Sequence, residues 1–212
     1  MKLIVLSFLF VTSLWSKDIV ENSFILLTKK INGYSYVCSG VAISPKKILT
    51  AAHCLDQAKS IKVIKEKTIG YRNTYIDVVE FEQHPDYNKN YSYFLNDIGI
   101  LILEESILSL NKIISIKEID PTEKVYRIGF GSRDGTNVMN LFELSPPIYN
   151  HNSYFFVYDS NSYSGDSGGP IFQKFDGDYY LVGIHSTLEG RSKTFNVSVE
   201  YFYDWLFSDL EI

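Results

Sequence analysis

Basic charge, cysteine and long apolar runs are all scarce in this chain of 212 residues. Asp and Glu outnumber Lys and Arg by 25 to 20, so the formal net charge is −5. This acidic balance offers no basic surface for a nucleic acid, and we expect no nucleic-acid partner. The apolar run near the amino terminus is shorter than the about 20 residues that a membrane-spanning helix needs. We therefore also expect no stable membrane span.

Histidine and cysteine are too few and too scattered to predict a metal site. The chain has four histidines, namely His53, His84, His151 and His185. No two of them stand at the spacing of metal ligands, and neither cysteine has a third ligand beside it. We expect no metal and no cofactor. The two cysteines, Cys38 and Cys54, form an even pair, which in an exported protein predicts one disulfide; two unrelated buried thiols are the alternative.

Residues 1–16, MKLIVLSFLFVTSLWS, have the parts of a signal peptide. Lys2 gives a short basic start, an apolar run extends from Leu3 to Leu14, and Ser16 is a small residue suited to cleavage. A membrane anchor is the alternative, but the apolar run is short and charged residues follow it directly. We expect an exported monomer, secreted or periplasmic.

The rest of the chain has the pattern of β-structure. Short runs rich in Val, Ile, Phe and Tyr alternate with turn residues, from SFILLTKK to KTFNVSV. This alternation is typical of barrels and sandwiches. The last segment differs, and its apolar residues stand at helical spacing after a candidate cap at Ser198: Val199, Phe202, Leu206 and Leu210. We predict an all-β fold with a C-terminal α-helix.

Three short segments carry the residue types of nucleophilic catalysis. In SGDSGGP, Ser167 precedes two glycines, and this turn can bring the N–H groups of Gly165 and Ser167 to one point. ILTAAHC contains His53 after a strand-like run, and LNDIGILIL opens an apolar strand at Asp97. A serine hydroxyl needs a base and a third group that orients this base. Each segment alone has an ordinary structural explanation, but together they predict a nucleophile, a base and an orienting carboxylate.

In this order, LTAAHC, NDIGILIL and SGDSGGP resemble the three signature segments of the chymotrypsin-like (trypsin-like) serine proteases. The resemblance implies two antiparallel β-barrels with the active site in the crevice between them. His53 and Asp97 would belong to an N-terminal barrel, residues 17–116. Ser167 would belong to a C-terminal barrel, residues 117–212. The implied function is that of a secreted serine endopeptidase, which acts on a protein or peptide through an acyl-enzyme intermediate.

The resemblance also assigns a role to each residue. Ser167 attacks the scissile carbonyl, and His53 takes the proton and returns it to the leaving amine. Asp97 holds His53 in the required tautomer, and the N–H groups of Gly165 and Ser167 form the oxyanion hole. Two alternatives stay open. A catalytically silent binding module can keep this fold, and an esterase would use the same triad.

The predicted specificity pocket lacks a carboxylate at its base. By the family pattern Asn161 stands there, Ser162 follows, and Ser164 lies near the pocket mouth. On the facing strand His185 directly precedes Ser186. A histidine at this point resembles the glutamate-specific branch of the family, because imidazole and hydroxyl groups can donate to a carboxylate. The prediction is an acidic P1 residue, and the alternative is that His185 is a packed strand residue.

The chain departs from the family pattern in its cross-links and in its activation. It has one cysteine pair, and Tyr163 stands where many relatives have a cysteine. Many relatives also free an Ile-Val amino terminus that pairs with the aspartate before the nucleophile, here Asp166. Ile19 and Val20 are present, but the short stretch from Val20 to Cys38 restricts their reach. We predict that the protein either matures without this switch or satisfies Asp166 internally.

Overall fold

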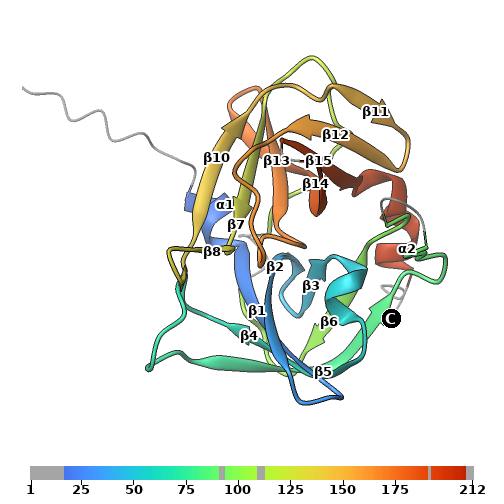
Figure 1. Cartoon of the computed structure of the whole chain (residues 1–212). Helices are drawn as coiled ribbons and strands as arrows, with labels where there is room; N and C mark the ends of the chain where they lie inside the picture. The colour runs from blue at the N-terminus through green and yellow to red at the C-terminus, as the bar shows by residue number, and fades with distance from the viewer. Residues whose placement is uncertain (1–16, 91–93, 109–112, 191, 209–212) are drawn as a thin grey trace, which may run out of the picture.

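The computed structural model describes residues 17–90, 94–108, 113–190 and 192–208. The predicted signal peptide, residues 1–16, lies outside these ranges. The described residues form two β-structures, drawn mainly in blue to green and in yellow to red (Figure 1). Within these ranges, no helix is long and apolar enough to cross a membrane.

The first β-structure is a closed barrel of six antiparallel strands with the order β1-β2-β3-β6-β5-β4. Its strands are β1 (Ser23–Lys30), β2 (Ser35–Ser44), β3 (Lys47–Thr50), β4 (Ala58–Ile64), β5 (Tyr75–Gln83) and β6 (Gly99–Leu103). Branched side chains are frequent in these strands and suit a pleated surface. They fill a core that includes Leu26, Ile48, Ile61, Val63 and Leu101. Burial of this core stabilises the barrel.

The second β-structure is a seven-stranded antiparallel sheet with the order β10-β7-β13-β14-β15-β12-β11. Its strands are β7 (Val125–Gly129), β10 (Asn140–Leu144), β11 (Tyr149–His151), β12 (Tyr154–Tyr158), β13 (Pro170–Phe175), β14 (Asp178–Glu189) and β15 (Lys193–Ser198). A hairpin of β8 (Ser132–Arg133) and β9 (Thr136–Asn137) follows β7. Among the described strands no pairing joins β10 to β11, so this half is a barrel-like sheet. The predicted all-β fold is confirmed.

The two halves share one apolar core, and the chain ends reinforce it. Core residues from both halves are in contact, among them Ile25, Leu49, Ile128, Ile184 and Phe195. Near the amino-terminal end, the short helix α1 (Lys17–Glu21) places the fully buried Ile19 in this core. At the other end, α2 (Tyr203–Phe207) lies beside the first barrel (Figure 1), where Nζ of Lys47 donates to the carbonyl oxygen of Leu206 at 3.0 Å. Each terminal helix therefore helps to hold the two halves together.

The C-terminal helix is present, but it begins differently from the prediction. Ser198 is the last residue of β15 and does not cap a helix, so that part of the prediction is wrong. The chain instead turns through the 3₁₀ helix η3 (Glu200–Phe202), and neither η3 nor α2 begins with a side-chain cap. The described apolar positions of the helical pattern are buried: Val199, Phe202 and Leu206. Leu210 lies outside the described residues.

Candidate active site

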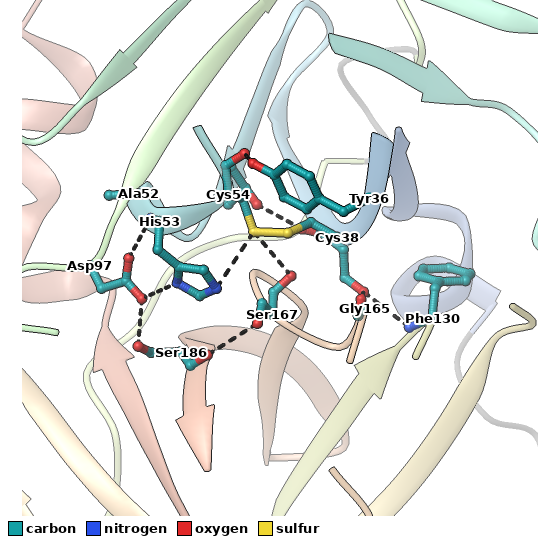
Figure 2. Close-up of a disulfide and its surroundings, with 12 residues drawn as sticks. Tyr36, Cys38, Ala52, His53, Cys54, Asp97, Phe130, Gly165, Ser167 and Ser186 are labelled. Carbon is teal, nitrogen blue, oxygen red and sulfur yellow. Dashed lines mark hydrogen bonds and ion pairs between the residues drawn. A yellow bond between two sulfur atoms is a disulfide. The ribbon is translucent and has the colours of Figure 1, made fainter. Parts of the chain in front are cut away.

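His53, Asp97 and Ser167 come together where the two β-structures meet (Figure 2). His53 lies in the 3₁₀ helix η1 (Ala52–Leu55), just after β3, and Asp97 lies just before β6. These strands are neighbours, with Thr50 paired to Gly99. The end of one strand and the start of the other therefore lie side by side. Ser167 comes from the loop between β12 and β13 in the second half.

A buried carboxylate orients the imidazole of His53. Oδ2 of Asp97 lies 2.7 Å from Nδ1 of His53, and Oδ1 accepts the backbone N–H of His53 at 2.8 Å. Oδ2 also accepts the hydroxyl of Ser186 at 2.5 Å. Asp97 is fully buried, and both of its carboxylate oxygens act as acceptors in these contacts. Nδ1 of His53 therefore carries the proton, and Nε2 is left as the basic nitrogen.

The same carboxylate strengthens His53 as a base. Burial of the imidazole opposes its protonation, whereas attraction to Asp97 and the hydrogen bond between the two side chains favour it. The net result is that the pKa of His53 is raised above its ordinary value. The ring of Phe94 lies against this histidine with ring centroids 5.3 Å apart, which shields the imidazole on one side.

The predicted disulfide is confirmed, and it lies directly beside the site. Cys38 and Cys54 are bonded, with their Cα atoms 6.3 Å apart, and they join β2 to η1. Sγ of Cys54 is 4.0 Å from Nε2 of His53 and 3.7 Å from the carbonyl oxygen of Ser167. In the described part of the chain, one His/Cys/Asp/Glu group has the proximity of metal ligands, namely Cys38, His53 and Cys54. Because both sulfurs are in the disulfide, this group has no thiolate to offer a metal.

The loop that carries Ser167 presents two backbone N–H groups that are free to bind a ligand. Gly165 has φ +105°, a conformation that favours glycine. The carbonyl oxygen of Ser164 accepts the N–H of Ser132 at 3.1 Å, so the trans peptide points the N–H of Gly165 the opposite way. Among the described residues, no acceptor takes the N–H of Gly165 or of Ser167. The hydroxyl of Ser167 donates to the carbonyl oxygen of Ser186 at 3.3 Å.

Asp166, the residue before the candidate nucleophile, is satisfied by other parts of the same chain. Its carboxylate accepts the N–H of Gly131 at 2.6 Å and the N–H of Tyr163 at 2.9 Å. Nη1 of Arg127 and Nη2 of Arg133 lie 3.1 and 3.2 Å from its Oδ2. Burial raises the pKa of Asp166, but the charge of Arg127 and the hydrogen bonds outweigh burial and hold this pKa below its ordinary value. Asp166 is therefore an ionised, buried carboxylate.

Arg127 is the main residue that the sequence analysis missed. It is fully buried, and its Nε lies 2.6 Å from Oδ2 of Asp159, which is also buried. One guanidinium thus faces two buried carboxylates, those of Asp159 and Asp166. The contact of Nη1 with Asp166 is an ion pair without hydrogen-bond alignment. The sequence does contain a sign of it, because Arg127 is the one charged residue in the strand VYRIG. A charged residue in such a strand is seldom buried unless it is paired, so a buried ion pair could have been predicted there.

A pocket of about 270 Å³ opens beside Ser167. The residues that line it are His53, Ser162, Tyr163, Ser164, Ser167, His185, Ser186, Thr187 and Leu188. Four of the five predicted substrate-binding residues are in this set, and the fifth, Asn161, is not. Asn161 is exposed, and its carbonyl oxygen accepts a hydrogen bond from Nη2 of Arg127 at 3.0 Å. It therefore connects the ion-pair network to the loop before the pocket.

His185 forms the buried end of a polar chain that reaches this pocket. Its side chain is 2 % exposed, with Nε2 at 2.8 Å from Oγ of Ser162 and Nδ1 at 3.3 Å from Oδ1 of Asn196. Burial, followed by the charge of Arg127, lowers the pKa of His185 to about 4. The ring is therefore neutral at pH 7. Because Oδ1 of Asn196 is an acceptor, Nδ1 donates to it, and Nε2 accepts the hydroxyl of Ser162.

A closed barrel and a barrel-like sheet, with histidine, aspartate and serine where they meet, define the chymotrypsin-like class of fold. The sequence model of the Trypsin family matches residues 20–206, and the chain belongs to this family. The solved structure of HL collagenase is similar in fold, with a TM-score of 0.74 and 20% identity. The similarity covers 91% of this chain and 94% of the collagenase.

Two curated relatives are mammalian proteins. The chain is 27% identical over 200 residues to vitamin K-dependent protein C of Mus musculus, covering 76% of this chain and 43% of the relative. It is 26% identical to the Rattus norvegicus protein, covering 76% and 42%. The chain thus spans less than half the length of these relatives. The matches support a serine endopeptidase at the level of the family.

Proposed function

We propose that this chain is a serine endopeptidase with the triad His53, Asp97 and Ser167. One observation carries the proposal: the buried Asp97, joined at 2.7 Å to the partly exposed His53, lies beside a serine whose loop offers two N–H groups without an acceptor among the described residues. A nucleophile, a base, an orienting carboxylate and oxyanion donors are the parts that acyl transfer requires. The family match makes peptide-bond hydrolysis the first chemistry to test.

In the proposed mechanism each group has one step. Oγ of Ser167 attacks the scissile carbonyl carbon while Nε2 of His53 takes its proton, and Asp97 stabilises the resulting imidazolium. The carbonyl oxygen becomes negative and is bound by the N–H groups of Gly165 and Ser167. His53 then protonates the leaving amine as the C–N bond breaks. Water repeats the sequence on the acyl-enzyme and releases the new carboxyl group.

Covalent labelling tests this mechanism directly. The chain is incubated with phenylmethylsulfonyl fluoride, digested, and analysed by mass spectrometry, with turnover of a peptide library measured in parallel. One adduct is expected on Ser167, absent from Ser167→Ala and retained in the exposed control Ser160→Ala. A folded protein that is not labelled would favour the silent binding module. Labelling with hydrolysis of esters but of no peptide would favour the esterase.

We further propose that the pocket prefers an acidic P1 side chain. Its wall contains His185 and the hydroxyl groups of Ser162 and Ser164, with Arg127 close enough to His185 to lower its pKa. A carboxylate that enters the pocket favours protonation of His185 or rotation of the Ser162 hydroxyl, and either change supplies a donor. Leu188 also lines the pocket and offers no polar contact. The acidic preference therefore depends mainly on His185.

The substrate backbone has an open strand edge next to this pocket. β13 pairs with β14 only as far as Ile184, whereas β14 continues to Glu189. Residues 186–188 line the pocket beyond that last pair. We propose that a substrate strand adds to this edge through main-chain hydrogen bonds.

We propose that the protein becomes active without the cleavage that creates a new amino terminus in many relatives. In many relatives a freed terminus neutralises the aspartate before the nucleophile, but here Arg127 and Arg133 already face Asp166. Ile19, the residue that would become such a terminus, is fully buried within α1. Internal pairing therefore supports the second of the two options derived from the sequence.

We propose a secreted or periplasmic monomer that residues 1–16 direct to export and that acts on proteins or peptides. The disulfide supports this location, because such bonds persist in oxidising compartments. The division into an N-terminal barrel, residues 17–116, and a C-terminal barrel, residues 117–212, stays a proposal. Next to this boundary, the N–H of Lys117 donates to the carbonyl oxygen of Leu181 in the second half at 3.0 Å.

A further inference from the structure

Ser39 is a fully buried serine of β2 that lies directly against the loop of the candidate nucleophile. Its Oγ donates to the carbonyl oxygen of Gly165 at 2.8 Å and accepts the N–H of Phe130 at 3.0 Å. Its own N–H donates to the carbonyl oxygen of Ser167 at 2.7 Å, and its carbonyl oxygen accepts the hydroxyl of Thr50 at 2.8 Å. One side chain from the first barrel thus contacts two segments of the second half.

We propose that Ser39 is a positioning residue for the oxyanion hole. Its hydroxyl holds the peptide group between Gly165 and Asp166, and thereby limits rotation at the glycine whose own N–H is the donor. This inference rests on the proposed function, because it assigns to Ser39 a part in stabilising the transition state of that reaction. Figure 2 shows Gly165 and Phe130 on the side of Ser167 away from Asp97.

The argument starts from the freedom of glycine. Gly165 joins two peptide groups, and without a Cβ it can rotate to φ values of either sign. The peptide on its amino side is held by Ser132, whose N–H donates to the carbonyl oxygen of Ser164 at 3.1 Å. The peptide on its carboxyl side is held by Ser39 at its oxygen and by Tyr163 at the N–H of Asp166, at 3.0 Å. Both torsions of Gly165 are therefore fixed by contacts outside the glycine itself.

Loss of the Ser39 hydroxyl removes the one hydrogen-bond donor that the Gly165 carbonyl oxygen has among the described residues. A buried carbonyl without a donor is costly, so rotation of its peptide towards water becomes favourable. The N–H of Gly165 lies in the neighbouring peptide group, which then depends on the contact with Ser132 alone and is less firmly directed at the developing oxyanion. The second donor, the N–H of Ser167, is held independently, since the backbone N–H of Ser39 binds the carbonyl oxygen of Ser167. The expected defect is therefore partial and specific to the transition state.

The test compares Ser39→Ala with Ser44→Ala. The alanine at position 39 keeps both backbone hydrogen bonds and deletes only the hydroxyl contacts. Ser44 is a control on the same strand, and within the described part of the chain its hydroxyl has one hydrogen bond, from the N–H of Lys46 at 3.4 Å. Folding is checked by circular dichroism, and the active fraction by stoichiometric labelling of Ser167. kcat and KM are measured on the best substrate from the peptide library, together with inhibition by the aldehyde of the same peptide.

For Ser39→Ala we expect kcat to fall by about 10- to 100-fold, below the loss reported for deleting a whole oxyanion donor. KM should stay within about twofold, because only transition-state binding is lost. The inhibition constant of the aldehyde should rise in parallel with the loss of kcat, since its tetrahedral adduct needs the same donors. Ser44→Ala should match the unmodified chain.

Three results would overturn the positioning role: unchanged kcat in Ser39→Ala, an equal loss in Ser44→Ala, or a rise in KM with aldehyde inhibition unchanged. Failure of the proposed function is distinguishable from these results. In that case the unmodified chain itself is neither labelled at Ser167 nor active on peptides, whereas failure of the inference alone leaves it active.

Discussion

Nη1 of Arg127 lies 3.1 Å from Oδ2 of Asp166, and both side chains are fully buried. The same guanidinium contacts Asp159 through Nε, so one positive charge offsets two negative charges away from water. Removing charges from water is costly unless they are paired. The loop that carries Ser167 therefore depends on β7, the strand that contributes Arg127.

Replacing Arg127 tests this dependence. Arg127→Met leaves two buried carboxylates without their shared partner, and breaking a buried pair costs about 3–5 kcal/mol. We expect a lower guanidinium unfolding midpoint, read by tryptophan fluorescence, and slower labelling of Ser167. Lys62→Met, which breaks the exposed pair with Asp77, serves as the control and should leave the midpoint nearly unchanged. A stable Arg127→Met chain that is labelled at the original rate would contradict the prediction.

The state of the amino terminus gives a second prediction. A chain that retains Lys17 and carries an added tag before it should be active, because Asp166 is paired internally. Amino-terminal sequencing of the active form, combined with labelling rates before and after removal of the tag, makes the measurement. Activity that arises only when the chain starts at Ile19 would disprove internal pairing as the activation mechanism.

The proposed acidic preference is tested at His185. If its imidazole binds a P1 carboxylate, a charged hydrogen bond of about 1.5–3 kcal/mol is lost in His185→Val. kcat/KM for glutamate at P1 should then fall by about 10- to 150-fold, while the matched glutamine peptide is little affected. His151→Val, at an exposed histidine, is the control. Preferred cleavage after Lys or Arg, or an unchanged profile in His185→Val, would refute the acidic preference.

The pH dependence of the reaction follows from His53. The imidazole must be neutral to accept a proton, so kcat/KM should fall as the pH drops through the raised pKa of His53. In Asp97→Asn the attraction is lost while burial remains, so this acidic limb should move to lower pH. By the precedent of the family, kcat should also fall by about 10⁴-fold. A pH–rate profile of both proteins measures the two effects, and identical acidic limbs would exclude the Asp97–His53 coupling.

The single disulfide gives a prediction about stability. Cys38 and Cys54 are separated by 16 positions, and closing a loop of this size stabilises a protein by about 3 kcal/mol. The double variant Cys38→Ala/Cys54→Ala should lose about this amount in guanidinium unfolding. Dithiothreitol should lower the midpoint of the original protein and leave that of the double variant unchanged. Equal sensitivity of both proteins to dithiothreitol would show that the effect has another source.

The sequence predicted those features whose chemistry is contained in short segments. His53, Asp97 and Ser167 each stand in a run that resembles a family signature, and the structure brings the three together. Strand β1 was visible as SFILLTKK because its apolar content and flanking turn residues are local. The sequence does not distinguish strand β3 from the segment ILTAAHC that follows its first residue. The four residues of β3, KILT, are too few to show the alternation of apolar and polar residues that marks a strand.

Long-range contacts could not be predicted in this way. Ser39 and Gly165 are 126 positions apart, and Arg127 and Asp159 are 32 apart, so no local pattern links either pair. A serine in an apolar strand and an arginine in another are visible as exceptions, but their partners depend on how the two halves meet. The start of the C-terminal helix was misplaced for a similar reason, because pairing with β14 extends β15 to Ser198.

The buried side chain of Asn196 has a consequence for producing the protein. Asn196-Val197-Ser198 is an acceptor sequence for N-linked sugars, yet Nδ2 of Asn196 is turned inwards and donates to the carbonyl oxygen of Thr194 at 3.2 Å. Asn196 is fully buried, so an oligosaccharide on its Nδ2 has no space in this fold. A chain that receives a glycan there during synthesis cannot reach this fold. Expression in a host that lacks N-glycosylation, or as Ser198→Ala in one that has it, separates this loss of yield from any defect of the protein itself.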